Sequence, residues 1–266
     1  MVWQGGANAV KPVGASKACL SKHHDCCPRA LVKLVRTCYP RLMLTFCRKS
    51  CAIAPIEIAK TGLLAGLMAA LAACTGPEAG PGSFYAYVET PPPQNNVVTV
   101  CHAYECRMRT RVALNGTDIG KLRAIMAEGA DTAEAERRAA ARAIAWLEIR
   151  VAPQVGTARD RGHDDFASAN DPSQTDCIDE ATNGTSYLTI LQQNGLLRHH
   201  TVGKPMTRGF IHGQMMHSTA VLLEKDNGAA YAVDSWILPN GKPAIVVPLN
   251  DWYRKSYVEL AKQAGA

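Results

Sequence analysis

The sequence predicts an α+β domain in which a helix that carries a cysteine packs on an antiparallel sheet. A capped helix is expected over residues 176–194, with Gly195 as its C-terminal stop. Short strand-like segments then follow one another directly, and a run of strands after a helix is typical of an α+β arrangement. Those segments are residues 196–202, 208–212, 216–223, 230–237 and 244–247. Residues 97–266 are numerous enough to bury a hydrophobic core of adequate size.

The net charge of the chain, +6, belongs to its N-terminal segment rather than to the predicted domain. Residues 1–73 hold 10 Lys and Arg against 2 Asp and Glu, whereas residues 74–266 hold 19 against 21. A domain with nearly balanced charge has no electrostatic footprint for nucleic acid. We therefore expect no nucleic-acid partner.

Residues 1–73 are predicted to be a signal or over-extended N-terminal segment that is not part of the fold. The uncharged run 61–73 is too short to span a bilayer as a helix, but it suits the apolar region of a signal peptide. Its Leu-Ala-Ala-Cys ending resembles a bacterial lipoprotein signal. This resemblance implies lipidation at Cys74 and anchoring at the periplasmic face of a bacterial membrane, the outer membrane in particular. Because signal peptides begin near the N-terminus, translation from Met43 would explain the long preceding segment; a membrane-associated basic N-terminus or a cytoplasmic protein is the alternative.

Residues 74–96 are rich in glycine and proline, and we expect them to form an extended tether behind the lipid anchor. Residues 97–101 and 106–114 follow as two strands whose short connection fits a hairpin loop. If the domain is exported, a disulfide between Cys101 and Cys106 would close this loop. In the alternative, both thiols are free and buried.

Two further helices are expected over residues 117–127 and 132–151, and a last short one over residues 250–264. The stretch 152–173 is irregular. It contains a polar cluster that lacks the alternating acids of a calcium loop and is typical of a polar surface loop. The cluster consists of Asp160, His163, Asp164 and Asp165.

The helix that begins after Asp176 carries a cysteine in its first turn. Asp176 is a good N-cap, and Asp179 lies three residues on, where the reciprocal partner of a capping box is found. Cys177 then occupies the first helical position, where free backbone N–H groups and the positive end of the helix dipole favour a thiolate. Such a cysteine is a candidate nucleophile; the alternative is a small buried hydrophobic residue. The charge of Asp176 would oppose thiolate formation unless capping engages it.

A histidine and an acid follow in the order that nucleophilic catalysis needs. His217 opens one predicted strand and Asp234 lies in the next, so His217 could act as general base while Asp234 orients its ring. Direct cross-strand pairing of the two requires a hairpin centred between residues 225 and 226. A two-residue turn at Asn227 and Gly228 would instead separate them by roughly 13 Å along the strand. The triad therefore requires a wider loop or a bulge.

Three short motifs occur in order along the chain: Thr-Asp-Cys-Ile-Asp-Glu-Ala from Thr175, His-Ser-Thr-Ala-Val-Leu from His217, and Ala-Val-Asp-Ser-Trp ending at Trp236. Together they resemble the bacterial transglutaminase-like cysteine proteinases, within the broader papain-like group. The resemblance covers residues 117–250 and implies a papain-like core that hydrolyses or transfers at an amide bond of a protein or peptide. It also implies that Cys177, His217 and Asp234 are catalytic, with the indole of Trp236 shielding the acid–histidine hydrogen bond from water.

Some members of that family bind calcium through acids on both sides of the cysteine. Here Ile178 follows Cys177, which departs from that pattern, so we expect no cofactor and keep calcium as the alternative. Gln174 is the nearest side chain that could donate to an oxyanion, although the papain-like glutamine lies further upstream. The backbone N–H of Cys177 is the safer assignment.

These features predict a lipid-anchored cysteine peptidase or amidase that faces the periplasm. The alternative is a non-catalytic lipoprotein that uses the same fold as a binding or envelope-assembly module. In the enzyme, Cys177 is expected to react with iodoacetamide well below the ordinary thiol pKa of about 8.5.

Overall fold

The computed structural model describes residues 76–163, 168–169 and 171–263 of the chain. The chain divides into two units, Met1–Ala59 and Lys60–Ala266, and every described residue belongs to the second. The predicted signal segment and Cys74 therefore lie outside the described residues. None of the described helices is long and apolar enough to cross a membrane.

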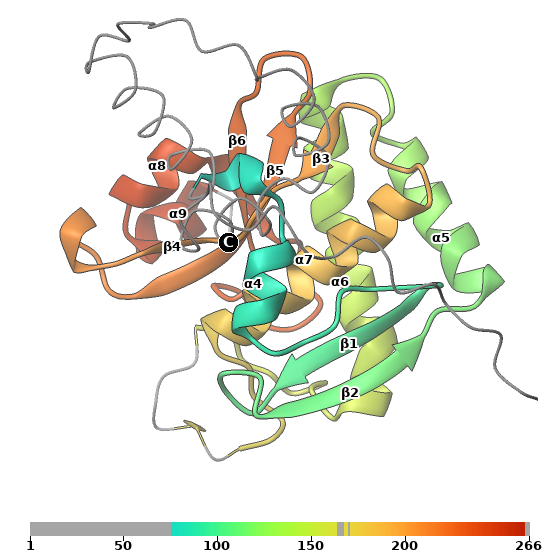
Figure 1. Cartoon of the computed structure of the whole chain (residues 1–266), viewed down its shortest axis with the longest axis horizontal. Helices are drawn as coiled ribbons and strands as arrows, with labels where there is room; N and C mark the ends of the chain where they lie inside the picture. Colours follow the sequence, from blue (N-terminus) through green and yellow to red (C-terminus); the bar gives the residue numbers. More distant parts are fainter. Residues whose placement is uncertain (1–75, 164–167, 170, 264–266) are drawn as a thin grey trace, which may run out of the picture. The chain divides into compact units, whose positions relative to one another are not determined.

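Two antiparallel sheets form the β part of the domain (Figure 1). The strands are β1 Val97–His102, β2 Met108–Ala113, β3 His200–Val202, β4 Met206–Arg208, β5 His217–Glu224, β6 Ala230–Asp234 and β7 Ile245–Pro248. The larger sheet has the order β3–β5–β6–β7, with β4 also paired to β5, and the smaller sheet is the hairpin of β1 and β2. Together with the helices, these antiparallel sheets confirm the predicted α+β class.

The helices surround one that lies at the centre of the domain, α7 (Figure 1). They are η1 Pro77–Ala79, α4 Gly82–Tyr87, α5 Gly116–Ala127, α6 Ala133–Val155, α7 Cys177–Gln193, η3 Phe210–His212, α8 Leu249–Arg254 and α9 Tyr257–Gln263. Helix α7 packs against both β5 and β1. The predicted last helix is thus two helices, because the backbone of Lys255 is extended (φ −88°, ψ 141°).

Helix α7 is buried at every position from residue 181 to residue 191, although several of these residues are polar. The hydroxyls of Thr185 and Thr189 donate to backbone carbonyls four residues earlier, at 2.6 and 2.7 Å. The side chain of Asn183 accepts from the Cys101 amide at 2.7 Å and donates to the Cys101 carbonyl at 2.8 Å, as a neighbouring strand would. These bonds satisfy the buried polar groups and fix the helix rigidly against β1.

The segment expected to be an extended tether is folded onto the domain from Pro77 onward. Phe84 and Tyr85 of α4 are buried, and the Tyr85 hydroxyl lies 3.1 Å from that of Ser186 in α7. The Pro77 carbonyl accepts from the backbone amide of Lys204 at 2.8 Å. The tether prediction is wrong here because two aromatic side chains in a Gly- and Pro-rich stretch bury enough apolar surface to order it.

The β5–β6 hairpin has a wide loop, as the triad requires, but its register is not the expected one. Ala220 pairs with Val233 and Leu223 with Ala230, so the hairpin is centred between residues 226 and 227. Asn227 and Gly228 lie within the five-residue loop between the two strands rather than forming a two-residue turn. Extending this register pairs position 217 with position 236, two residues beyond the end of β6. The expectation that the histidine and the acid are direct cross-strand neighbours is wrong.

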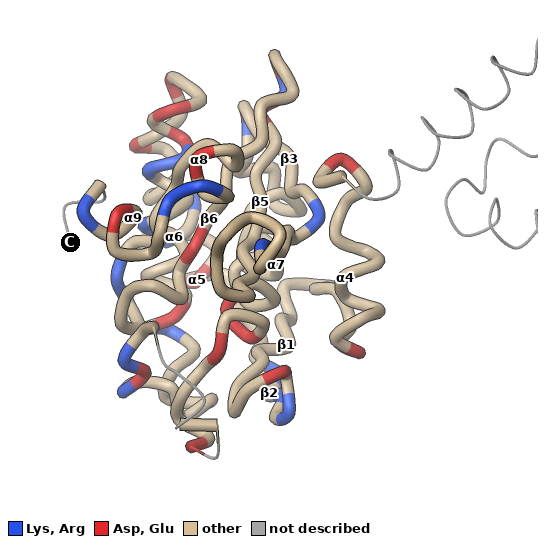
Figure 2. Tube along the Cα trace, turned by 90° about the vertical axis from the view of Figure 1, so that its left-hand side faces the viewer, with Lys and Arg blue, Asp and Glu red and all other residues tan. Residues whose placement is uncertain are grey.

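Acidic and basic residues are interspersed over the described domain (Figure 2). This mixture agrees with the nearly balanced charge of residues 74–266. Mixed charge of this kind gives no electrostatic argument for the binding of a polyanion such as nucleic acid.

Candidate active site

The start of α7 forms the predicted capping box. Asp176 accepts through Oδ1 from the amides of Ile178 at 3.0 Å and Asp179 at 2.8 Å, and Asp179 accepts from the Asp176 amide at 3.2 Å. Cys177 is the first residue of the helix, and among the described cysteines it alone is free. The local prediction for this helix start is therefore confirmed.

The same two carboxylates also hold the loop between β1 and β2. Asp179, which is fully buried, accepts from the amides of Tyr104 at 2.9 Å and Cys106 at 2.7 Å, and Asp176 accepts from the amide of Glu105 at 3.1 Å. Residues 103–106 all have positive φ, which is costly for residues other than glycine and persists only where the surroundings impose it. The loop is thus bound to the first turn of α7.

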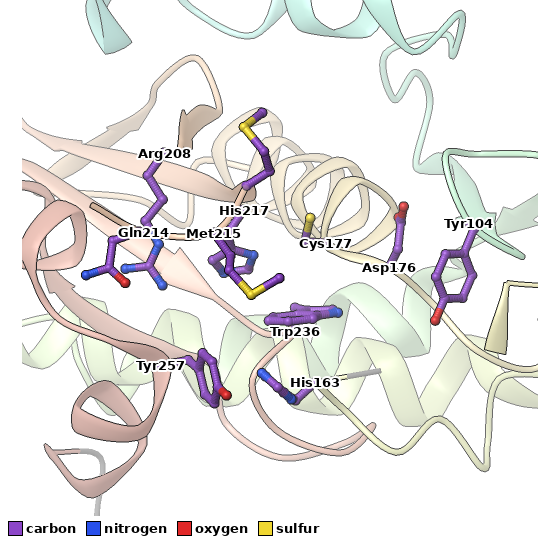
Figure 3. Close-up of a pocket in the computed structure, with 11 residues that line it drawn as sticks. Tyr104, His163, Asp176, Cys177, Arg208, Gln214, Met215, His217, Trp236 and Tyr257 are labelled. Carbon is purple, nitrogen blue, oxygen red and sulfur yellow. The ribbon is translucent and has the colours of Figure 1, made fainter. Parts of the chain in front are cut away.

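A disulfide between Cys101 and Cys106 closes this loop, as predicted for an exported domain. Cys106 is itself the last of the four positive-φ residues, and both half-cystines are fully buried. The side chain of Tyr104 projects from the loop to the edge of the cleft that contains Cys177 (Figure 3).

His217 and Asp234 form a hydrogen-bonded pair. The Nε2 atom of His217 lies 2.6 Å from Oδ2 of Asp234, and both side chains are almost fully buried. The two residues are diagonal rather than direct neighbours across β5 and β6, and their side chains are long enough to close that offset. Bonding at Nε2 leaves Nδ1 of His217 without a partner among the described residues. Figure 3 shows His217 beside Cys177.

Two effects oppose thiolate formation at Cys177, which is half-buried at the cleft. Burial, followed by the negative charge of Asp176, raises the pKa of Cys177 to about 12. The backbone amide of Ser218 lowers it, but by less. The raised pKa opposes the expectation that the helix N-terminus makes Cys177 reactive well below the ordinary thiol pKa, and labelling over a series of pH values tests that expectation.

Two indoles enclose the histidine–acid pair. The ring of Trp236, the predicted shield, lies 4.6 Å from the His217 ring, and that of Trp252 lies 5.5 Å away. Trp252 also donates from Nε1 to Oδ2 of Asp234 at 2.8 Å. Sequence reasoning missed Trp252, since it lies in a predicted terminal helix and no local motif marks it.

The three predicted catalytic residues meet at the edge of a cavity of about 190 Å³. Cys177 and His217 line it directly, whereas Asp234 lies behind His217. Apolar and aromatic side chains form most of the remaining wall: Tyr104, His163, Met215, Met216, Trp236 and Tyr257. Figure 3 shows Asp176 and Tyr104 at one end of the cleft, Arg208 and Gln214 at the other, and Cys177 and His217 between them.

His163, assigned from the sequence to a polar surface loop, lines this cleft instead. Its ring lies 4.6 Å from Trp236 and 3.9 Å from Tyr257. Asp160 from the same segment is buried and accepts from the Thr175 amide at 2.8 Å. The surface-loop prediction is wrong at Asp160, which packs behind the start of α7, whereas His163 is exposed at the mouth of the cleft. Asp164 and Asp165 lie outside the described residues.

A second acid, Glu180, connects the cysteine helix to the strand that ends at Asp234. Glu180 lies one turn after Cys177 and accepts from the hydroxyl of Ser235 at 2.5 Å and from that of Thr175 at 3.0 Å. Burial, followed by the charge of Asp160, raises the pKa of Glu180 to about 7. No local pattern indicates this role for Glu180, because an acid in a first helical turn is ordinarily a surface residue.

Gln174 is not in a position to donate to a substrate oxyanion. Its side chain is buried and bonded to the backbone of the preceding segment, donating to the Arg159 carbonyl at 3.0 Å and accepting from the Arg161 amide at 3.2 Å. Gln174 therefore supports the loop that leads into α7. The amide of Cys177, at the free end of the helix, is the remaining candidate donor.

The two carboxylates next to Cys177 in the sequence are engaged by the protein itself. The oxygens of Asp176 and Asp179 accept hydrogen bonds from backbone amides, which compete with a cation for them. Sulfur atoms of Cys101 and Cys106 lie within 4.8 Å of a carboxylate oxygen of Asp179, a grouping that could hold a metal. Because the two sulfurs are bonded to each other, neither is a thiolate ligand in this state.

The fold and site thus define an α+β domain with a cysteine, a histidine and an acid at one cleft. Comparison with family models, with curated proteins and with solved structures found no match for the chain.

Proposed function

We propose that this protein is a cysteine amidase or peptidase of transglutaminase-like, papain-like architecture, with Cys177 as nucleophile, His217 as general base and Asp234 as orienting acid. The observation that supports it most is the bonding of His217. Its Nε2 atom is 2.6 Å from Asp234, which favours the tautomer with the proton on Nε2 and leaves Nδ1 as the acceptor of a ring that lies beside Cys177. A neutral imidazole with this tautomer is a general base.

The raised pKa of Cys177 determines the order of proton movements. Because the resting sulfur is a thiol, its proton passes to Nδ1 of His217 as the sulfur attacks the acyl carbon of the amide. Asp234 stabilises the imidazolium that forms, and the amide of Cys177 donates to the developing oxyanion. The imidazolium then protonates the leaving amine, and water, activated by the same imidazole, hydrolyses the thioester.

The enclosure of the histidine–acid pair supports the same reading. Trp252 donates to Asp234, and the rings of Trp236 and Trp252 flank His217, so little water reaches the pair. In a site of low dielectric, the carboxylate stabilises a neighbouring imidazolium more strongly than it would in water.

The alternative is a non-catalytic protein that uses the same cleft to bind a partner. The observation in its favour is the pKa of Cys177, since a thiol that stays protonated is a weak nucleophile unless a base assists it. The two proposals therefore differ in whether His217 activates Cys177.

Acylation by p-nitrophenyl acetate tests the proposal without knowledge of the natural substrate. The Cys177 peptide of the folded wild-type chain should acquire an acetyl group, detected by mass spectrometry. His217→Gln should lower that rate by about 100- to 10,000-fold, the usual contribution of a positioned base. Cys177→Ala should abolish it. Equal rates in the wild type and in His217→Gln would refute catalysis and favour the binding protein.

We further propose that the domain is exported and anchored through Cys74, with a protein or peptide substrate at the periplasmic face of the outer membrane. The disulfide supports export, because such bonds persist in oxidising compartments. Mass spectrometry of the mature chain should find a lipidated Cys74 at its N-terminus. A chain that begins at an unmodified Met1 would contradict the anchor.

A further inference from the structure

The end of the cleft opposite Asp176 contains a buried cation. Arg208 lines the cavity beside Gln214, and its side chain is only 3 % exposed (Figure 3). It lies on β4 directly opposite His217 on β5, and side chains of directly paired residues point to the same face of the sheet. The guanidinium is therefore adjacent to the catalytic histidine.

No carboxylate within ion-pair distance neutralises Arg208 among the described residues. Both hydrogen bonds of its guanidinium leave from Nη1, to the carbonyls of Trp252 and Lys255, and Nε is buried without a partner. Burial lowers the pKa of Arg208, which reflects a poorly solvated cation, although the charge of Asp234 partly opposes this. A buried charge without an ion-pair partner is unfavourable unless a ligand compensates it.

The geometry of the guanidinium also suits one kind of ligand. The two carbonyls fix Nη1, and the guanidinium lies over the Trp252 ring, 4.7 Å from its centre. The plane of the guanidinium is therefore fixed before any ligand binds. Nε is buried, and Nη2 makes no hydrogen bond with the described residues, so Nη2 is the nitrogen left to donate to a ligand in the cavity that Arg208 lines. A guanidinium N–H donates a charge-assisted hydrogen bond to a carboxylate.

We propose that Arg208 is the anion-recognising residue of the cleft and that the substrate carries a carboxylate on the Arg208 side of the scissile amide. This inference rests on the proposed function and adds the substrate class. Asp176 at the opposite end would repel the same group, so the cleft orients the substrate. An acidic side chain or a terminal carboxylate next to the cleaved bond has the required chemistry.

Alkylation of Cys177 by iodoacetate and by iodoacetamide tests this inference in the full chain. Both reagents form the same S–C bond and release iodide, and they differ in whether the group beside the carbon is a carboxylate or an amide. The ratio of the two rates is measured at one pH on the Cys177 peptide, because the chain has other cysteines upstream. The same ratio in the urea-unfolded chain is the reference.

The folded wild type should prefer iodoacetate over that reference by about 10- to 100-fold, the range of a charge-assisted hydrogen-bond pair. Arg208→Gln should return the ratio to the reference. Arg208→Lys keeps the charge but loses the planar guanidinium, so it should retain part of the preference. Arg137→Gln removes a charge at a distant pair with Glu224 and should leave the ratio unchanged.

Since Arg208 also holds α8, a second measurement uses the wild type alone. Acetate should slow iodoacetamide labelling of Cys177, and acetamide at the same concentration and ionic strength should not. A ratio equal to the reference, no protection by acetate, or labelling by neither reagent would each overturn the inference. Because acetylation by p-nitrophenyl acetate needs no anion site, it can still succeed in those cases, so failure here is distinct from failure of the proposed function.

Discussion

Replacing Glu180 by glutamine should make the domain more stable at neutral and alkaline pH and leave its stability at acid pH almost unchanged. Glu180 is half-buried, and desolvation of its carboxyl group raises the pKa from 4.5 to about 7 in the folded protein. The folded state therefore holds a proton that the unfolded state releases between these two values. Stability from this group is fully present below 4.5 and is lost as the pH rises through about 7.

The size of the effect follows from the same two values. The gap between 4.5 and about 7 corresponds to about 3 kcal/mol of unfolding free energy. Glutamine resembles the protonated acid and can keep bonds to the hydroxyls of Thr175 and Ser235, so Glu180→Gln should be more stable than the wild type by up to this amount above pH 7. The unfolding free energies of the two proteins should converge below pH 4.5.

Urea unfolding at a series of pH values measures the difference directly. Glu134→Gln is a matched control, because Glu134 forms a surface pair with Arg138 in which both side chains are more than half exposed. That variant should follow the wild type at every pH. Buried Glu148, whose pKa burial and Glu180 also raise, will leave some pH dependence in Glu180→Gln. Parallel curves for the wild type and Glu180→Gln would refute the argument that burial holds a proton on Glu180.

Three further substitutions test the site. Asp176→Asn keeps a good N-cap and removes a negative charge beside the sulfur, so the pKa of Cys177 should fall and iodoacetamide labelling should begin at lower pH. Trp252→Phe removes the 2.8 Å bond to Asp234 and should lower the acetylation rate about 10-fold. Asp179→Ala removes the carboxylate that accepts from three backbone amides, and it should lower the urea-unfolding free energy by about 3–5 kcal/mol. An unchanged labelling profile, an unchanged rate or a loss below about 1 kcal/mol would contradict the respective prediction.

The start of α7 could be predicted because its determinants are local. A capping box needs only an acid at the N-cap and another three residues later, and Asp176 and Asp179 satisfy it wherever the helix lies. The disulfide could also be predicted from the sequence, because Cys101 and Cys106 flank a short loop. The order of Cys177 and the later histidine and acid was also readable along the chain.

Other parts of the site depend on packing that no local pattern records. Trp252 reaches Asp234 from another element, and Arg208 is identified only by the absence of a partner in its buried surroundings. The raised pKa of Cys177 likewise depends on how the chain packs around the sulfur. The helix position that favours a thiolate is visible in the sequence, whereas the burial that outweighs it is a property of the folded chain.

The acids at the start of α7 explain how a protonated cysteine is compatible with a catalytic site. Asp176 and Asp179 are required to start the helix and to hold the positive-φ loop of Tyr104, so the fold cannot dispense with negative charge beside Cys177. That charge and the burial keep the sulfur protonated, which makes a resting thiolate–imidazolium pair unfavourable. In the proposed mechanism, proton transfer to His217 then accompanies attack, so the reaction requires that His217 be held in place as the proton acceptor. The bond from His217 to Asp234 and the two indoles around it meet that requirement.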